Sequence, residues 1–157
     1  MADGDDLDVV AVISSTAPNA QRFLLGGEGQ THFTLIPRWS GLTVFRVITG
    51  STLQAIGASL SNDGTLYAIR GHLSGVASPG NDSSFIRTND ASAAAANGDA
   101  GAVSFGADRL VFFSVGASEF VGNCHALIAK AGGFSVPELA ELTARVNEAF
   151  GLQLSSV

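Results

Sequence analysis

Residues 135–151 read SVPELAELTARVNEAFG, and they carry the clearest structural signature in the chain. Ser135 and Glu138 have the spacing of a capping box, in which each side chain satisfies a backbone amide at the start of a helix. Pro137 is tolerated in the first turn, where its missing N–H costs nothing, and Gly151 suits a left-handed cap at the end. We therefore predict a helix between these caps. Its apolar stripe consists of Leu139, Leu142, Val146, Ala149 and Phe150.

A second helix is expected immediately before the first. Ser118 is a suitable N-cap residue, and Gly132 and Gly133 are suitable residues to end the helix. Between them, apolar side chains recur at helical spacing, at Phe120, Cys124, Leu127, Ile128 and Ala131. The C-terminal part of the chain is thus predicted to contain two helices.

The first two-thirds of the chain favours β-strands. Residues 7–13 form a short run rich in Val and Ile, and residues 41–50 are largely apolar on both alternating faces, which indicates a strand covered on both sides. Asp63 and Gly64 lie between two apolar runs and predict a β-hairpin, because Gly accepts positive φ at no steric cost. The expected fold class is α+β: a mainly antiparallel β-sheet followed by two C-terminal helices.

Residues 74–101 differ from the rest of the chain in composition. They are rich in Ala, Ser and Gly, with Phe85 and Ile86 as large apolar anchors. We expect a long surface loop or arm here, with one helical turn at 91–96. Residues 1–6 are expected to form a flexible acidic tail and residues 7–157 a single globular domain.

The charge balance disfavours several kinds of partner. The chain of 157 residues has a net charge of −6, and only 14% of its residues are charged, against ~25% in typical globular proteins. Its 8 Lys and Arg residues include no adjacent pair, whereas nucleic-acid binding needs clustered bases that displace counterions. DNA, RNA and anionic membrane surfaces are therefore disfavoured as partners, and no stretch approaches the ~18 apolar residues of a membrane span.

The cysteine content and the N-terminus indicate the compartment. Cys124 is the single cysteine, so no intrachain disulfide can form. The N-terminus is acidic and its first apolar run is short, unlike a secretory signal. We expect the protein to stay in a reducing cytoplasm, or in a virion if it is a structural component of one.

No catalytic, cofactor-binding or metal-binding motif stands out. Cys124 and His125 are neighbours, but neighbours in a helix point about 100° apart, so Cys124 is expected to be a small buried hydrophobe with a raised pKa. His32, His72 and His125 lack the spacing of metal ligands. No catalytic, cofactor-binding or metal-binding residue and no cofactor is therefore predicted, and a non-enzymatic protein is favoured.

Three aromatic residues are candidates for an interface. Trp39 follows Pro37 at an expected strand end; exposed, it would mark an interface hot spot, and buried, it would belong to the core. Phe112 and Phe113 lie in the run LVFF, which would promote aggregation on an exposed strand edge. That run is expected to be a central strand or to pair with another subunit.

Two functions from different classes remain open. The first is a non-enzymatic structural or assembly protein, a homo-oligomer subunit that associates with itself or with another structural protein, such as a coat, cement or decoration protein of a virion. Low charge and the absence of catalytic motifs favour it, and strands followed by two helices are also seen in some small viral coat subunits, an analogy of fold alone. The second is a small-molecule-binding domain or small enzyme with a site assembled around His72 and His125.

Overall fold

The computed structural model describes residues 6–16, 25–27, 33–36, 44–49, 52–59, 63–73, 85–94, 110–112, 114–115, 118–119 and 122–157. The strands in these ranges are β1 (Leu7–Ser14), β2 (Leu25–Gly27), β3 (Phe33–Ile36), β4 (Val44–Thr49), β5 (Thr52–Ser59), β6 (Tyr67–Leu73), β7 (Phe85–Thr88), β8 (Ala91–Ala94), β9 (Leu110–Phe112), β10 (Ser114–Val115), β11 (Ser118–Glu119) and β12 (Asn123–Ala131). The helix is α1 (Val136–Phe150).

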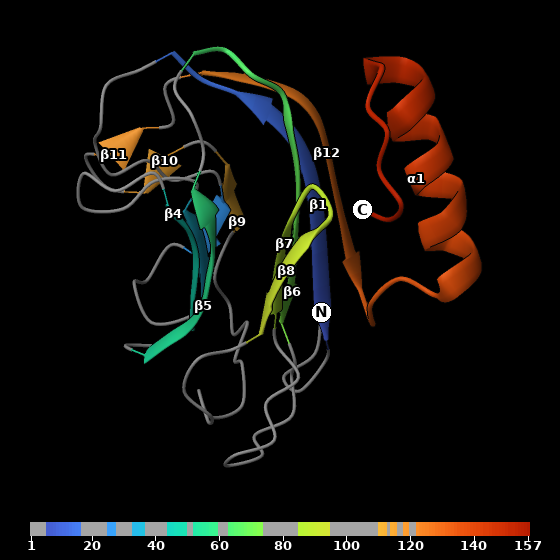
Figure 1. Ribbon diagram of the computed structural model, residues 1–157. Helices are drawn as coiled ribbons and strands as arrows, with labels where there is room; N and C mark the ends of the chain where they lie inside the picture. The colour runs from blue at the N-terminus through green and yellow to red at the C-terminus, as the bar shows by residue number, and fades with distance from the viewer. Residues whose placement is uncertain are drawn as a thin grey trace.

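The described elements form three layers. The first sheet has the strand order β12-β1-β6-β7-β8, the second has the order β5-β4-β3-β2-β9, and all pairs within them are antiparallel. Strand β5 contacts both β7 and β8, so the two sheets pack against each other. Helix α1 lies on the opposite side of the first sheet, which is therefore the middle layer (Figure 1). The prediction of antiparallel β-structure followed by a C-terminal helix is confirmed.

Strand β1 lies between β12 and β6 in the middle layer. All eight of its residues are buried. Val10 and Val12 point to α1 and belong to one apolar cluster with Leu142 and Val146 of the helix. Since successive side chains of a strand alternate between the faces of a sheet, the odd-numbered residues of β1 face the second sheet. Cover on both faces explains why residues 7–13 are an apolar run rather than an alternating pattern.

Helix α1 begins and ends where its sequence predicts. The Glu138 carboxylate accepts hydrogen bonds from the backbone N–H of Ser135 at 2.8 Å and from its hydroxyl at 2.7 Å. At the other end Gly151 adopts the left-handed conformation, with φ of 66°, and its N–H donates to the carbonyl of Asn147 at 2.9 Å. The prediction of this helix is confirmed. The helix could be predicted from the sequence because its caps and its apolar stripe are local features.

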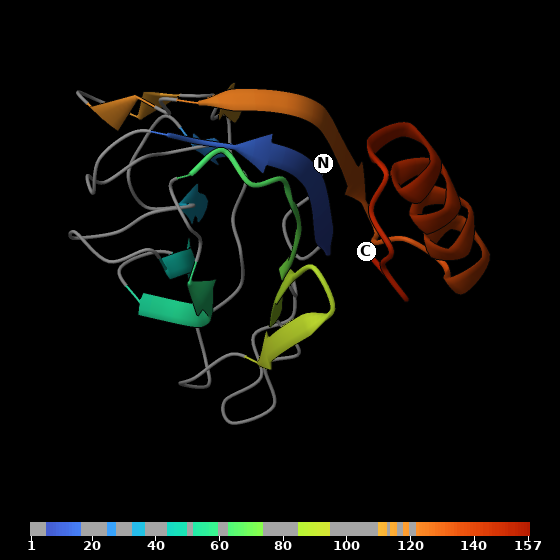
Figure 2. The same ribbon diagram turned by 45° about the horizontal axis from the view of Figure 1, so that its top comes forward.

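The second predicted helix is wrong. Its described residues form β11 and the nine-residue strand β12, which pairs along its length with β1, from Leu7 opposite Ala131 to Ser14 opposite Asn123 (Figure 2). The apolar run 126–129 fits a strand as well as a helix, and the spacing of the apolar residues alone does not decide between them. Pairing with the buried strand β1 decides it, because tertiary context overrides the weak intrinsic preference for helix.

The predicted hairpin at Asp63 and Gly64 is also wrong, although the turn itself is present. Gly64 has φ of 88°, and the side chain of Asp63 accepts the N–H of Thr65 at 2.9 Å. However, β5 before the turn belongs to the second sheet and β6 after it to the first. The turn therefore carries the chain from one layer to the other, which turn chemistry alone does not reveal.

The region predicted as a loop at 74–101 contains a β-hairpin, so that prediction is wrong for residues 85–94. Strands β7 and β8 pair with each other, and β7 also pairs with β6. Asn89, with φ of 49°, forms the turn; its amide oxygen accepts the N–H of Ala68 at 3.0 Å and its own N–H donates to the carbonyl of Ala68 at 2.7 Å. The expected helical turn is wrong over 91–94, which is strand. The flanking parts, like most of the predicted acidic tail, lie outside the described residues.

Candidate functional site

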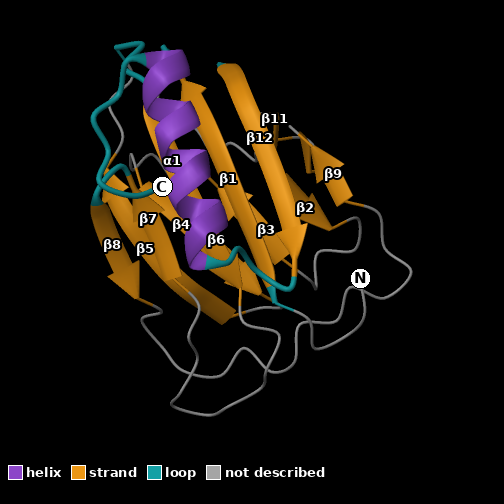
Figure 3. Ribbon diagram, turned by 90° about the vertical axis from the view of Figure 1, so that its right-hand side faces the viewer, coloured by secondary structure: helices purple, strands orange, loops and turns teal. Residues whose placement is uncertain are grey.

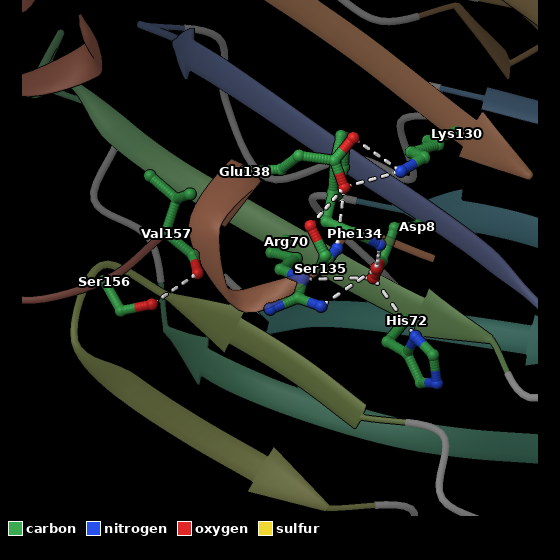
Figure 4. A network of polar contacts seen from close by, with 9 residues as sticks. All are labelled: Asp8, Arg70, His72, Lys130, Phe134, Ser135, Glu138, Ser156 and Val157. Carbon is green, nitrogen blue, oxygen red and sulfur yellow. Dashed lines mark hydrogen bonds and ion pairs between the residues drawn. The ribbon is translucent and has the colours of Figure 1, made fainter. Parts of the chain in front are cut away.

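A buried cluster of polar groups surrounds Asp8 of β1. Asp8 has no exposed surface. Its carboxylate accepts hydrogen bonds from Arg70 Nε at 3.0 Å, from Arg70 Nη2 at 2.9 Å and from the backbone N–H of Phe134 at 2.7 Å, and His72 Nδ1 lies 3.1 Å from Oδ1 (Figure 4). Because an ionised carboxylate only accepts hydrogen bonds, His72 Nδ1 carries the proton that it shares with Asp8.

The register of the sheet brings these residues together. Asp8 lies opposite His72, and Val10 lies opposite Arg70, so Arg70 and His72 are on the face of β6 that points to α1. After β12, Gly132 and Gly133 turn the chain with φ of 80° and 74°. The turn directs the amide of Phe134 at the carboxylate. The cluster thus joins β1, β6 and the segment that leads into the helix.

The hydrogen bonds keep Asp8 ionised. Burial by itself raises the pKa of Asp8, but the hydrogen bonds from His72, Arg70 and Phe134, together with the charge of Arg70, lower it to about 2. Four hydrogen bonds occupy both carboxylate oxygens. This arrangement suits a structural clamp, and it leaves Asp8 without an open lone pair for general-base chemistry.

Phe85 closes the cluster on the side of β7. The guanidinium carbon of Arg70 lies 5.0 Å from the centre of the Phe85 ring, which is cation–π geometry. The His72 ring stacks on the same phenyl ring, with 5.1 Å between the centroids and 21° between the planes. Both basic side chains are thus held by a carboxylate and by an aromatic ring.

His125 lies elsewhere, at the far end of β1. The pairing of β12 with β1 shifts by one residue between Val12 and Ile13, so His125 is the extra residue of a β-bulge. Its Nε2 shares a hydrogen bond of 3.0 Å with the Ser14 hydroxyl, and its ring meets Phe150 edge to face at 6.1 Å. The bulge therefore turns His125 towards the helix.

The structure does not bring His72 and His125 together. His72 is opposite Asp8, and His125 is bonded to Ser14. At ~3.3 Å per residue, six residues of strand separate the two positions by roughly 20 Å. A single site built around both histidines is therefore not supported, and His32 lies outside the described residues.

Cys124 behaves as a half-buried hydrophobe. Burial raises the pKa of its thiol, as expected from the sequence, and Sγ donates to the carbonyl of Ala126 at 3.4 Å. It lies on a strand rather than on a helix, and the ring of the neighbouring His125 is bonded to Ser14. Across the described part of the chain, no group of three or more His, Cys, Asp or Glu side chains could hold a metal ion.

The predicted interface residues are placed only in part. Trp39 and Phe113 lie outside the described residues. The backbone of Phe112 belongs to β9, opposite Leu25 of β2, and β9 is at one end of the strand order of the second sheet. Both expectations for this run, a central strand or pairing with another subunit, stay predictions.

A site that sequence reasoning missed is the outer edge of β12. Among the described strands, β12 pairs with β1 alone and ends the first sheet. Helix α1 lies over the neighbouring strands and leaves β12 beside it (Figure 3). The side chain of Ile128, in the middle of β12, is 40% exposed. We name this feature the β12 edge, meaning residues 126–130 and their outward-facing backbone.

The β12 edge has almost no charge. Lys130 is its one charged residue, and its ammonium is bound by the Glu138 carboxylate of α1, with N–O distances of 2.7 and 2.6 Å. Lys130 also lies 5.7 Å from the centre of the Phe134 ring. The four residues before it, 126–129, are all apolar. This apolar run is the feature of the sequence that indicates the β12 edge, provided that the segment is taken to be a strand.

Comparisons with known proteins identify no relative: no protein-family model matches the chain, and no curated protein matches it. Within the described residues, no helix is long and apolar enough to cross a membrane.

Proposed function

We propose that the chain is a non-enzymatic structural subunit that assembles with copies of itself, and that the β12 edge carries the assembly. The observation behind this proposal is an apolar strand at the end of a sheet, with the large side chain of Ile128 40% exposed at its middle. Coat, cement and decoration proteins of virions are subunits of this class, and the proposal includes them.

Strand edges carry unpaired N–H and C=O groups, which form a template for pairing with another chain. Natural proteins protect such edges with charges, prolines and bulges. On β12 a bulge lies at His125 and the charged Lys130 lies at the other end, but Glu138 holds the Lys130 ammonium over the helix. The apolar run 126–129 between them has none of these protections, which supports pairing there.

The polar cluster around Asp8 supports a structural rather than a catalytic role. Its carboxylate is fully occupied by Arg70, His72 and Phe134. A catalytic acid or base must be able to exchange a proton with the substrate. The Asp8 carboxylate instead binds only the protein's own backbone and side chains.

Light scattering after size-exclusion chromatography tests the proposal. We expect the wild-type chain to elute as an oligomer at high micromolar concentration, and Ile128→Lys to elute as a monomer because the edge then carries a charge. Val136→Lys is the matched control: Val136 is 80% exposed at the start of α1 and is not part of the β12 edge, so this variant should associate like the wild type. A wild-type chain that is a clean monomer at high micromolar concentration contradicts the proposal.

A further inference from the structure

We infer that two copies of the chain pair through β12, antiparallel, about a two-fold axis at Ile128, and thereby join their first sheets into one continuous sheet. This inference rests on the proposed self-association and specifies the partner, a second copy, and the register. The inference rests on the five residues of the β12 edge, 126–130, and on the bulge and the turn at their two ends.

The bounds of the regular strand select the register. On one side, the bulge at His125 interrupts the pairing with β1, and a bulge disrupts a regular ladder. On the other side, Gly132 turns the chain away, and its N–H is bonded to the carbonyl of Asp6 at 2.8 Å. The midpoint of the regular segment 126–130 is Ile128. An axis there places Leu127 opposite Ala129 of the second copy and keeps the bulge out of the paired residues.

Charge favours an antiparallel arrangement over a parallel one. A parallel pair in register would place Lys130 beside Lys130 of the second copy, and like charges opposite each other are destabilising. In the antiparallel pair about Ile128, Lys130 lies opposite Ala126, which has no charge. Each Lys130 keeps its own Glu138 partner in the same subunit.

On the two-fold axis, the exposed side chain of Ile128 contacts Ile128 of the second copy. Ile128 lies opposite Val10 of β1, and Val10 packs in the cluster beneath α1, so Ile128 is on the helix side of the sheet. A two-fold axis perpendicular to the sheet keeps both helices on this side. The two Ile128 side chains then contact each other between the two helices and lose their exposure to water.

Such a pair is closed and self-complementary. The same edge is used by both copies, which is the isologous interface of a two-fold dimer. The joined sheet has the strand order β8-β7-β6-β1-β12 in one copy, followed by β12-β1-β6-β7-β8 in the other. Any larger assembly then uses the dimer as its unit and a different surface for its further contacts.

Cysteine cross-linking tests the register. In a Cys124→Ser background, Ile128→Cys places two thiols on the axis, where opposite Cβ atoms are ~5 Å apart, close to disulfide distance. We expect mild oxidation to produce a disulfide-linked dimer several-fold faster than in Val136→Cys, made in the same background. Val136 is the more exposed of the two side chains, so random collision would favour that control instead.

A third variant separates failure of this inference from failure of the proposed function. Leu127→Cys, also in the Cys124→Ser background, reports an axis shifted by one residue. Faster cross-linking through Leu127 than through Ile128, in a chain that light scattering shows to be dimeric, overturns the register but leaves self-association standing. A dimeric chain that cross-links through neither strand position also overturns the inference. A monomeric chain overturns both proposals.

Discussion

Arg70 and Asp8 form a two-point ion pair within the middle layer of the fold. Arg70 Nε and Nη2 donate to the two carboxylate oxygens at 3.0 and 2.9 Å, and only 10% of the Arg70 side chain and 1% of the Asp8 side chain are exposed. The two residues are 62 positions apart in the chain. Their pairing therefore depends on the register of β1 with β6.

Replacing Asp8 with Asn should strongly destabilise the fold. The change keeps the size of the side chain but leaves the buried guanidinium of Arg70 without its counter-charge, and breaking a buried pair in this way costs about 3–5 kcal/mol. Urea denaturation measures the free energy of unfolding. A double variant, Asp8→Leu with Arg70→Met, should lose less than the sum of the two single changes, since neither charge is then buried alone. A loss below about 1 kcal/mol in Asp8→Asn, the range of an ordinary substitution, would show that the pair is not a clamp.

Stability should fall in acid because of Asp8. Its pKa is lowered from 3.8 to about 2 in the folded chain, so the folded state binds its proton less readily than the unfolded state does. The stabilisation is fully present above the unfolded pKa and is lost as the pH falls through the folded pKa. At about 1.4 kcal/mol per pKa unit, roughly 2 kcal/mol disappears between pH ~4 and pH ~2. Measured against Asp8→Asn, the advantage of the wild type in unfolding free energy should shrink over this window; a constant difference would contradict the assignment.

Two adjacent glycines offer a test of the turn beside Asp8. Gly132 and Gly133 both have positive φ, at 80° and 74°, so alanine is strained by about 1–2 kcal/mol at either position. A Cβ at Gly133 would also lie 3.3 Å from Oδ2 of Asp8, whereas one at Gly132 meets nothing within 4 Å. Gly133→Ala should therefore lower the melting temperature more than Gly132→Ala does. Equal losses would mean that the carboxylate does not constrain this turn.

How far the fold could be predicted depends on whether its cause is local. Helix α1 was predictable because Ser135, Glu138 and Gly151 act within a turn of its ends. The strand β12 was not predictable, since the spacing of its apolar residues fits both a helix and a strand. Pairing with β1 selects the strand. Asp63 and Gly64 specify a turn, but the sheet that receives the next strand is set by packing of the whole domain.

The Asp8 cluster was missed for a related reason. In the sequence, Asp8 reads as one more acid near an acidic N-terminus. The sequence signal for the cluster is the position of Asp8 inside an apolar strand, because a buried carboxylate needs hydrogen-bond partners. Arg70 and His72, two residues apart on β6, supply these partners. That connection requires the register between strands far apart in the sequence, which composition and spacing do not contain.

The N-terminal cap of α1 should contribute measurably to stability. In Ser135→Ala the N-cap hydroxyl, which forms the capping box with Glu138, is lost, and removal of an N-cap side chain costs about 1 kcal/mol. Ser135→Gly is the informative comparison, because Gly at this position costs only a few tenths of a kcal/mol. Thermal denaturation followed by circular dichroism would measure both. If the alanine variant melts no lower than the glycine variant, the side chain does not cap the helix.

Thr88 and Thr143 are buried hydroxyl residues that should respond in opposite ways to the same change. Among the described residues, Thr88 Oγ1 is the buried side-chain atom without a hydrogen-bond partner, and leaving a hydroxyl buried and unpaired costs about 1–3 kcal/mol. Thr88→Val keeps the shape and removes that penalty, so the free energy of unfolding should rise by about 1 kcal/mol.

Thr143 Oγ1 instead donates to the carbonyl of Leu139 at 2.6 Å and accepts the N–H of Val157 at 3.1 Å. Thr143→Val breaks both bonds and leaves a buried amide unpaired, so it should destabilise the chain by about 1–3 kcal/mol. Chemical denaturation of the two variants decides the matter: a loss of stability in Thr88→Val would mean that its hydroxyl has a partner in the folded protein.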